Sequence, residues 1–170
     1  PYVLMNWQNN VNNLYTLAHE FGHSMHSYYS RANQPYQYAD YSIFVAEVAS
    51  TCNEELLFDH LMNTLDDEKQ KIYLLNQWLD GFRGTVFRQT MFAEFEHMIH
   101  EMDAKGEAIT ADKLTTVYYD LNKKYFGDAM KVDEEIGLEW ARIPHFYYNY
   151  YVYQYATGQS AATALSKQIL

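Results

Sequence analysis

The sequence has 170 residues, of which 48% are hydrophobic, and its net charge of −10 results from 12 Lys and Arg against 22 Asp and Glu. A surface with this excess of carboxylates repels phosphate backbones, so we expect no nucleic-acid partner. The apolar runs are far shorter than the roughly 20 residues of a membrane helix, so we expect no membrane partner either.

The same composition predicts one globular domain over residues 1–170, because its apolar content suffices for a buried core. The only cysteine, Cys52, cannot form an internal disulfide, which favours a reducing compartment and hence a cytoplasmic protein. The chain begins at Pro1 within an apolar run, and we interpret it as a portion of a longer protein.

The spacing of apolar residues predicts a mainly α fold with one short strand. An apolar run that ends in asparagines predicts an edge strand at Tyr2 to Asn6. Three-and-four spacing predicts four helices, at Val11 to Ser30, Tyr41 to Met62, Asp67 to Met102 and Ala111 to Phe126. Asn12 or Asn13 could cap the first helix, and Gly81 and Gly84 mark kinks or close contacts in the third.

The first predicted helix contains the motif H-E-x-x-H, at His19-Glu20-Phe21-Gly22-His23. Residues four apart lie one turn apart on the same helix face, so both imidazoles can reach one metal ion, while Glu20 lies to the side. Two neutral imidazoles would hold Zn²⁺ at about 2.0–2.1 Å and leave room for a third protein ligand and a water. Histidines at this spacing can also merely cap or pack, so a third ligand decides between the two interpretations.

Two residues are candidates for that third ligand, His26 and Glu47. His26 comes seven residues after His19, about 10.5 Å along the helix axis, which is too far to share a metal with His23. We expect His26 to support the site or to pack. Glu47 lies between Ala46 and Val48 in an apolar stretch, where burial is costly unless the carboxylate is paired or bound to metal, although an exposed helix face is the alternative.

Three segments resemble the catalytic region of the oligoendopeptidase F family, in the thimet-oligopeptidase group. They are His19 to Tyr29 (HEFGHSMHSYY), Tyr41 to Glu54 (YSIFVAEVASTCNE) and Pro144 to Gly158 (PHFYYNYYVYQYATG). The resemblance implies a helical, zincin-like catalytic region with one zinc ion per chain, held by His19, His23 and Glu47, and Glu20 as catalytic base. It also implies short peptides as substrates and a missing N-terminal part that would form the opposite wall of a substrate channel.

The segment after Pro144 contains His145 and six tyrosines, at 147, 148, 150, 151, 153 and 155. One interpretation is a buried aromatic helix. The other is that the imidazole and some hydroxyls stabilise the oxyanion of a transition state, a use that the resemblance also implies. On a helix His145, Tyr148 and Tyr151 would share one face, but Tyr147, Tyr150 or Tyr153 could replace the latter two.

Other polar residues are weaker candidates. Glu54 follows Glu47 by two helical turns and either orients a histidine ligand or is exposed. Cys52 has no positive neighbour in sequence and is expected to be a small buried hydrophobe. A further group of acidic residues and histidines has a composition similar to that of a metal site, but we expect it to form the solvated face of a helix. Its members are Glu94, Glu96, His97, His100 and Glu101.

These observations predict a zinc-dependent endopeptidase that hydrolyses short peptides with a metal-activated water, with proton transfer through Glu20. Val3 to Asn6 would then form main-chain hydrogen bonds to an extended substrate by strand addition. The alternatives are a non-catalytic zinc- or peptide-binding helical domain, and a structural helical bundle in which Glu47 faces solvent.

Overall fold

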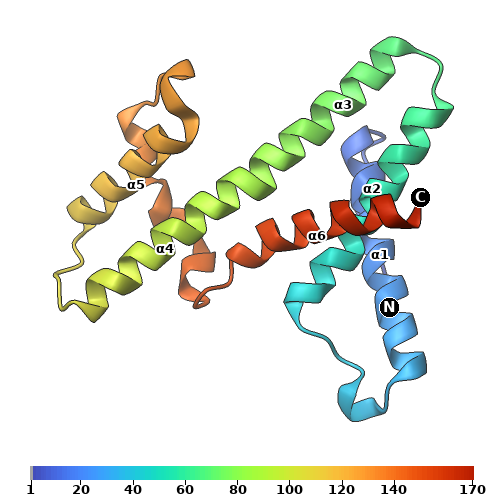
Figure 1. Ribbon diagram of the computed structural model, residues 1–170, viewed down its shortest axis with the longest axis horizontal. Helices are drawn as coiled ribbons and strands as arrows, with labels where there is room; N and C mark the ends of the chain where they lie inside the picture. The colour runs from blue at the N-terminus through green and yellow to red at the C-terminus, as the bar shows by residue number, and fades with distance from the viewer. Residues whose placement is uncertain (1) are drawn as a thin grey trace. The chain divides into compact units, whose positions relative to one another are not determined.

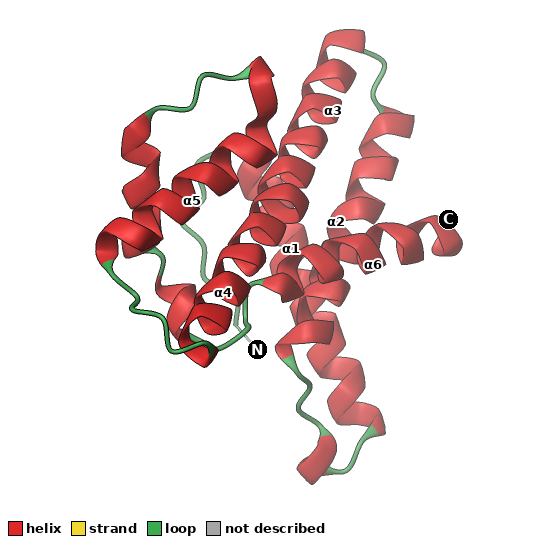
Figure 2. Ribbon diagram, turned by 60° about the vertical axis from the view of Figure 1, so that its left-hand side comes forward, coloured by secondary structure: helices red, strands yellow, loops and turns green. Residues whose placement is uncertain are grey.

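The computed structural model describes residues 2–170 and confirms a mainly α fold (Figure 1). Figure 2, coloured by secondary structure, shows helices joined by loops, and no strand is formed within residues 2–170. The contacts divide the chain into two compact units: the first holds Pro1–Arg83 and Thr157–Leu170, and the second holds Gly84–Ala156. In the described part of the chain, no helix combines the length and the apolar character needed to cross a membrane.

The first unit is built on a pair of long helices, α1 (Val11–Asn33) and α2 (Ile43–Thr64), with the short turn η1 (Tyr36–Tyr38) between them. Asn10 caps α1, because its side chain accepts the N–H of Asn13; the expected caps Asn12 and Asn13 lie one or more residues inside the helix. The loop is tied back to α1 by Ser30, whose hydroxyl donates to the carbonyl of Ala39 at 2.6 Å.

Small residues let α1 and α2 approach closely. Gly22 is the buried residue of α1, and a Cβ added to it would lie 2.6 Å from the Cα of Ser50, which is itself fully buried on α2. Nearby, the side-chain amide of Asn53 donates to the carbonyl of Ala18 at 2.6 Å. The space between the two helices at Gly22 is therefore too small for any side chain, and a larger residue at position 22 would force the helices apart.

A single buried carboxylate joins three helices of the first unit. Glu55 of α2 accepts both the indole N–H of Trp78, on α3 (Glu68–Phe82), and hydrogen bonds from Gln159 and Thr163, on α6 (Tyr153–Ile169). These distances lie between 2.9 and 3.1 Å. The carboxylate therefore fixes α3 and the C-terminal helix against α2.

The second unit has an aromatic core between α4 (Arg88–Ala104) and α5 (Ala111–Phe126). Its centre is formed by Phe95 and Tyr118, both fully buried, with ring centroids 5.0 Å apart in an edge-to-face arrangement. The remaining elements of the unit are the short turns η3 (Gly127–Ala129), η4 (Glu134–Arg142) and η5 (Pro144–Tyr147). Glu139 of η4 accepts from Arg88 and from the buried Tyr118 hydroxyl, which joins η4 to this core.

The sequence placed three of the helices to within a few residues, and α5 has the predicted bounds. The single helix expected at Asp67 to Met102 is instead divided into α3 and α4 by a π-helical turn, η2 (Arg83–Phe87). Gly84, one of the two expected kink points, lies in this turn. A π turn inserts one residue into the helical ladder, so it shifts the face that the following residues present.

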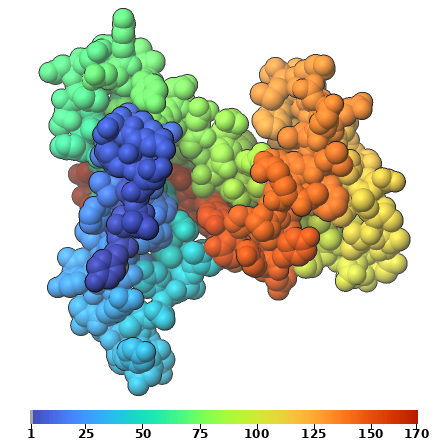
Figure 3. Space-filling model, turned by 180° about the vertical axis from the view of Figure 1, so that it is seen from behind, coloured from blue at the N-terminus to red at the C-terminus, as the bar shows by residue number. Residues whose placement is uncertain are grey.

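The expected edge strand at Tyr2 to Asn6 is wrong for this structure. Residues 2–7 have no regular secondary structure, and Tyr2 and Leu4 are fully exposed. Figure 3 shows this segment in dark blue at the surface. A strand exists only through hydrogen bonds to a neighbouring strand, and the described residues provide none. Strand addition by a substrate at this segment stays a prediction.

The helix expected directly after Pro144 is also wrong. Pro144–Tyr147 form the short turn η5, and α6 begins only at Tyr153. Between them Asn149 and Tyr150 have φ values of 29° and 54°, which no α-helix accommodates.

Replacing Gly22 with Ala tests the close helix contact. We expect Gly22→Ala to destabilise the first unit by roughly 1–3 kcal/mol, because the new Cβ meets backbone atoms that cannot rotate away. The matched control is Gly81→Ala on the exposed face of α3, where a Cβ meets nothing within 4 Å; there we expect a gain of about 0.5–1 kcal/mol. Urea unfolding followed by circular dichroism measures both, and equal midpoints for the two variants would contradict the contact.

Candidate metal centre

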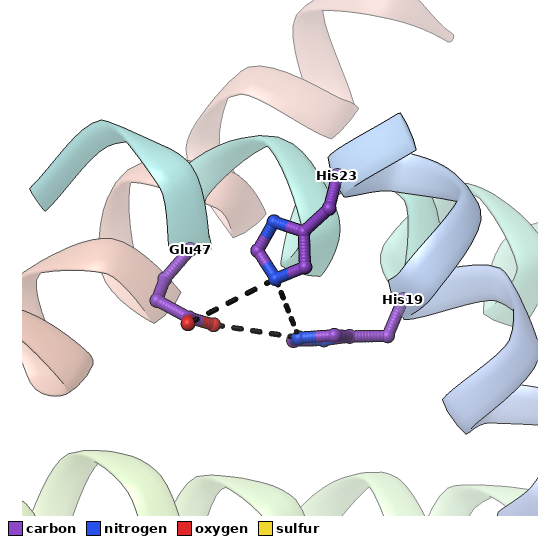
Figure 4. Close-up of side chains that lie close together, drawn as sticks. All are labelled: His19, His23 and Glu47. Carbon is purple, nitrogen blue, oxygen red and sulfur yellow. Dashed lines mark hydrogen bonds and ion pairs between the residues drawn. The ribbon is translucent and has the colours of Figure 1, made fainter. Parts of the chain in front are cut away.

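Three side chains from α1 and α2 point at one place (Figure 4). The Nε2 atoms of His19 and His23 are 3.1 Å apart. The Glu47 carboxylate closes the triangle, with Oε2 at 3.5 Å from Nε2 of His19 and Oε1 at 3.9 Å from Nε2 of His23. One potential ligand atom from each of these three residues lies within 4.8 Å of the other two, and within residues 2–170 no other group of three His, Cys, Asp or Glu side chains meets this condition.

The spacing of these atoms fits a tetrahedral metal ion. Ligands at 2.0–2.1 Å in a tetrahedron are separated by about 3.3–3.4 Å, which falls inside the observed range of 3.1 to 3.9 Å. The donors are two imidazole nitrogens and one carboxylate oxygen, and they are partly shielded from solvent, with side-chain exposures of 25%, 27% and 18%. The residues present therefore fit a metal ion with three protein ligands.

Helix packing brings the three candidate ligands together. The i, i+4 spacing brings the rings of His19 and His23 to a centroid distance of 4.7 Å, nearly perpendicular to each other. The glycine contact at Gly22 sets the distance from this pair to α2. Gly158 of α6 lies beside Glu47, since a Cβ built at Gly158 would be in ordinary van der Waals contact with that of Glu47, at 3.5 Å.

Glu54 orients His19 from behind the site. Nδ1 of His19 lies 2.6 Å from Oε1 of Glu54, and an ionised carboxylate can only accept, so Nδ1 carries the proton and Nε2 presents its lone pair to the site. Burial lowers the pKa of His19, but the hydrogen bond and charge of Glu54, with the charges of Glu47 and Glu20, outweigh burial and raise that pKa above its usual value. Of the two alternatives for Glu54, the structure therefore shows the contact with a histidine.

Glu20 lies beside the convergent group and is not one of its three members. Its charge contributes to the raised pKa of His19, which places its carboxylate within electrostatic reach of that ring. Its side chain is partly buried. A carboxylate that is near the ligands but not among them can accept a proton without competing for the metal.

His145, Tyr148 and Tyr151 come together in the second unit, although not as one face of a helix. The ring of His145 stacks on Tyr151 at a centroid distance of 5.8 Å and meets Tyr148 edge-on at 6.2 Å. Tyr155 completes this group, with its hydroxyl 3.4 Å from that of Tyr151. The turn η5 and the irregular backbone after it bring the rings together, and sequence periodicity contains no signal for such a backbone.

The other candidate residues make ordinary structural contacts. His26 stacks on the ring of Tyr41, with centroids 3.7 Å apart, as expected for a packed residue. Burial and then the charge of Glu55 raise the pKa of the Cys52 thiol, which does not suit a nucleophile. In the expected solvated cluster on α4, Glu94 pairs with Lys124 and Tyr125, whereas Glu96 is buried, contrary to the expectation of a solvated face.

Sequence reasoning did not identify Glu55 or Gly158 as parts of this region. The sequence analysis assigned no role to Glu55, and its contacts show that it binds α3 and α6. Gly158 is the last residue of the third segment that resembles the oligoendopeptidase F family, and this resemblance was the available signal for it. Its role against Glu47 depends on a helix more than a hundred residues away in sequence.

Comparison with known proteins defines the class of protein. The model of the family described as "Peptidase family M3" matches residues 1–170, so the chain belongs to this family of peptidases. The chain is 74% identical over 170 residues to Oligopeptidase PepF of Bacillus subtilis (strain 168), covering 100% of the chain and 25% of that protein. It is 55% identical over 169 residues to the chromosomal Oligoendopeptidase F of Lactococcus lactis subsp. cremoris, covering 99% of the chain and 28% of that protein.

A solved structure shows the same fold. The crystal structure of oligoendopeptidase-F from Enterococcus faecium superposes with a TM-score of 0.80 at 53% identity, over 94% of this chain and 29% of that one. The chain thus spans about a quarter of the length of the curated relatives described above.

The contact between His19 and Glu54 generates a titration prediction. In the metal-free protein, Glu54→Gln should lower the pKa of His19, because the hydrogen-bonded negative charge is lost and burial of the ring remains. NMR titration of the histidine ring protons measures this shift. Asp59→Asn is the control, since it removes a carboxylate of α2 that contacts Asn63 instead; an unchanged His19 pKa in Glu54→Gln would contradict the assignment.

Proposed function

We propose that this chain supplies the metal centre of a zinc-dependent endopeptidase that hydrolyses short peptides with a metal-activated water. The observation that supports this most directly is the convergence of His19, His23 and Glu47, with a further carboxylate, Glu20, beside them. Membership of peptidase family M3 agrees with this chemistry.

Zinc is the proposed metal, one ion per chain, held by His19, His23 and Glu47. Two imidazoles and one carboxylate form a ligand set typical of catalytic zinc, and three protein ligands leave a coordination position open. When bound, zinc supplies a Lewis acid that polarises a carbonyl and brings the pKa of a bound water towards about 7. The Nδ1 proton of His19, directed to Glu54, keeps the other ring nitrogen available as a ligand.

Glu20 is the proposed general base. It accepts a proton from the attacking water as the new carbon–oxygen bond forms, and it donates that proton to the amine as the peptide carbon–nitrogen bond breaks. The products are a carboxylic acid and an amine, which become a carboxylate and an ammonium group when the proton of the acid passes to the amine, so atoms and protons balance with water as the only co-substrate. Glu20 holds no metal in this scheme, which agrees with its place beside the convergent group.

The proposed substrates are short peptides rather than folded proteins. The names of the relatives, oligopeptidase and oligoendopeptidase, support this size class. Most of the length of those relatives lies outside the region that this chain matches. We propose that the corresponding N-terminal part of the whole protein completes the substrate channel, and that the protein is cytoplasmic.

Two substitutions in the full-length protein separate proton transfer from metal binding. Glu20→Gln should keep zinc and lose about 10²–10⁴-fold in turnover, because the amide cannot accept the proton. Glu47→Ala should instead lose most of the zinc, because one of three ligands is missing. Elemental analysis after dialysis and a quenched-fluorescent peptide assay measure the two properties. Full turnover in Glu20→Gln would exclude the mechanism and favour a non-catalytic zinc- or peptide-binding domain; full zinc in Glu47→Ala would exclude the ligand set.

His145 and at least one tyrosine near it are proposed to stabilise the transition state. The stacked group of His145, Tyr148 and Tyr151 offers donors whose positions are set before substrate binds, which is the requirement for oxyanion stabilisation. Tyr148 and Tyr151 are the first choices, and the other tyrosines of residues 147–155 are the alternatives.

Replacing these donors should act on kcat. His145→Ala, or Tyr→Phe at the correct position, should lower kcat roughly 10²–10³-fold with zinc content and KM little changed, since the lost hydrogen bond forms mainly in the transition state. Tyr→Phe keeps the aromatic packing, and Tyr36→Phe on the exposed turn η1 is the control. Near-normal kcat in His145→Ala and in all six Tyr→Phe variants of this segment would show that it only packs.

A further inference from the structure

Glu96 is a buried acidic residue that the proposed chemistry does not use. It lies on α4 and is 2% exposed. Among the described residues its basic neighbour is His100, whose Nε2 lies 3.9 Å from Oε1, and no Lys or Arg is paired with it; its second oxygen, Oε2, is buried without a hydrogen bond. Burial of a carboxyl group under these conditions costs free energy, and a methionine or leucine would fill the same space without that cost. The position of its other oxygen is therefore informative.

That other oxygen accepts a backbone hydrogen bond from the tyrosine-rich segment. Oε1 of Glu96 lies 2.5 Å from the backbone nitrogen of Tyr150. Tyr150 belongs to the irregular stretch between η5 and α6, residues 148–152, which we call the tyrosine loop. No backbone hydrogen bond of a helix or strand engages this N–H, so the carboxyl group of Glu96 is its partner.

The same face of α4 also holds the side chain of Tyr150. His100, one helical turn after Glu96, stacks on the Tyr150 ring with centroids 4.5 Å apart and an interplanar angle of 22°. Tyr150 is thus fixed at its backbone by one residue of α4 and at its ring by another.

The backbone that these contacts hold is strained. Asn149 and Tyr150 both have positive φ, and for Tyr150 this is the left-handed region that a bulky side chain rarely adopts. Such conformations persist only where the surroundings impose them, and they concentrate at functional sites. In this loop the strained residues lie between Tyr148 and Tyr151, whose rings contact His145. The direction of the backbone at positions 149 and 150 therefore determines where those rings lie.

We infer that Glu96 is a positioning residue that holds the tyrosine loop in its strained conformation and so sets the placement of the loop's hydroxyl groups for turnover. This inference rests on the proposed role of the His145 and tyrosine group. Glu96 touches neither substrate nor metal in this scheme; it acts through the N–H of Tyr150.

Three variants of the full-length protein test the inference. Glu96→Met keeps the volume and removes the acceptor, Glu96→Gln keeps an acceptor oxygen, and Glu101→Met makes the same chemical change at an exposed position of α4. Hydrogen exchange at the Tyr150 amide reports whether the loop is held, independently of activity. Peptide hydrolysis gives kcat and KM.

We expect Glu96→Met to accelerate exchange at Tyr150 and to lower kcat roughly 10–10²-fold, the effect of small displacements of positioned groups, with KM little changed. Glu96→Gln should remain near the parent in both measurements, and so should Glu101→Met. Unchanged exchange in Glu96→Met would overturn the inference, and so would fast exchange with normal kcat, or a Glu96→Gln variant as impaired as Glu96→Met.

If Glu96→Met does not fold, measurements on the parent protein and on Glu96→Gln still test the inference. A Tyr150 amide that exchanges at the rate of an unprotected amide in the parent would overturn the inference. The Glu20→Gln variant keeps this test distinct from that of the proposed function. Full turnover in Glu20→Gln refutes the peptidase mechanism, whereas loss of turnover in Glu20→Gln with normal kcat in folded Glu96→Met refutes only the positioning role.

Discussion

The close contact of α1 with α2 at Gly22 is the constraint on which the rest of the proposed metal centre depends. Two histidines on one helix provide only half of a ligand set, and the third ligand must come from another helix at a fixed distance. With no side chain at position 22, the backbone of α2 at Ser50 lies against α1, and the Glu47 carboxylate comes within 3.5 Å of His19. A larger residue between the two histidines would separate the ligands that the motif brings together.

The three glutamates of α2 divide their contacts according to helical geometry. Glu47 and Glu54 are seven residues apart and therefore share a face, from which one meets both histidines and the other meets the rear nitrogen of His19. Glu55 is turned about 100° further round the helix, so it contacts α3 and α6 instead. One helix thus carries one proposed ligand, Glu47, contacts a second, His19, and binds the neighbouring helices α3 and α6.

The second unit combines a regular aromatic core with an irregular segment. Phe95 and Tyr118 pack α4 against α5, and residues after Pro144, among them Phe146 and Val152, pack on this core. Glu96, beside Phe95 on the same helix, faces the tyrosine loop. A well-packed helix next to a strained loop allows the loop to keep a conformation that its own sequence disfavours.

Helical periodicity and the i, i+4 motif are local properties of the chain, so the sequence was enough to predict the mainly α fold, the approximate bounds of most helices and the pair His19 and His23. Glu47 followed from the apolar stretch around it and from the family resemblance. Three features became visible only in the folded chain: residues 2–6 form no strand, a π turn occupies Arg83–Phe87, and Gly158 lies beside Glu47. The tertiary structure also decided the burial of Glu96, which periodicity assigned to a solvated face, and the irregular backbone at Tyr150. The place of Gly158, the burial of Glu96 and the position of Tyr150 depend on contacts between residues far apart in sequence, and such contacts leave no periodic signal in the sequence itself.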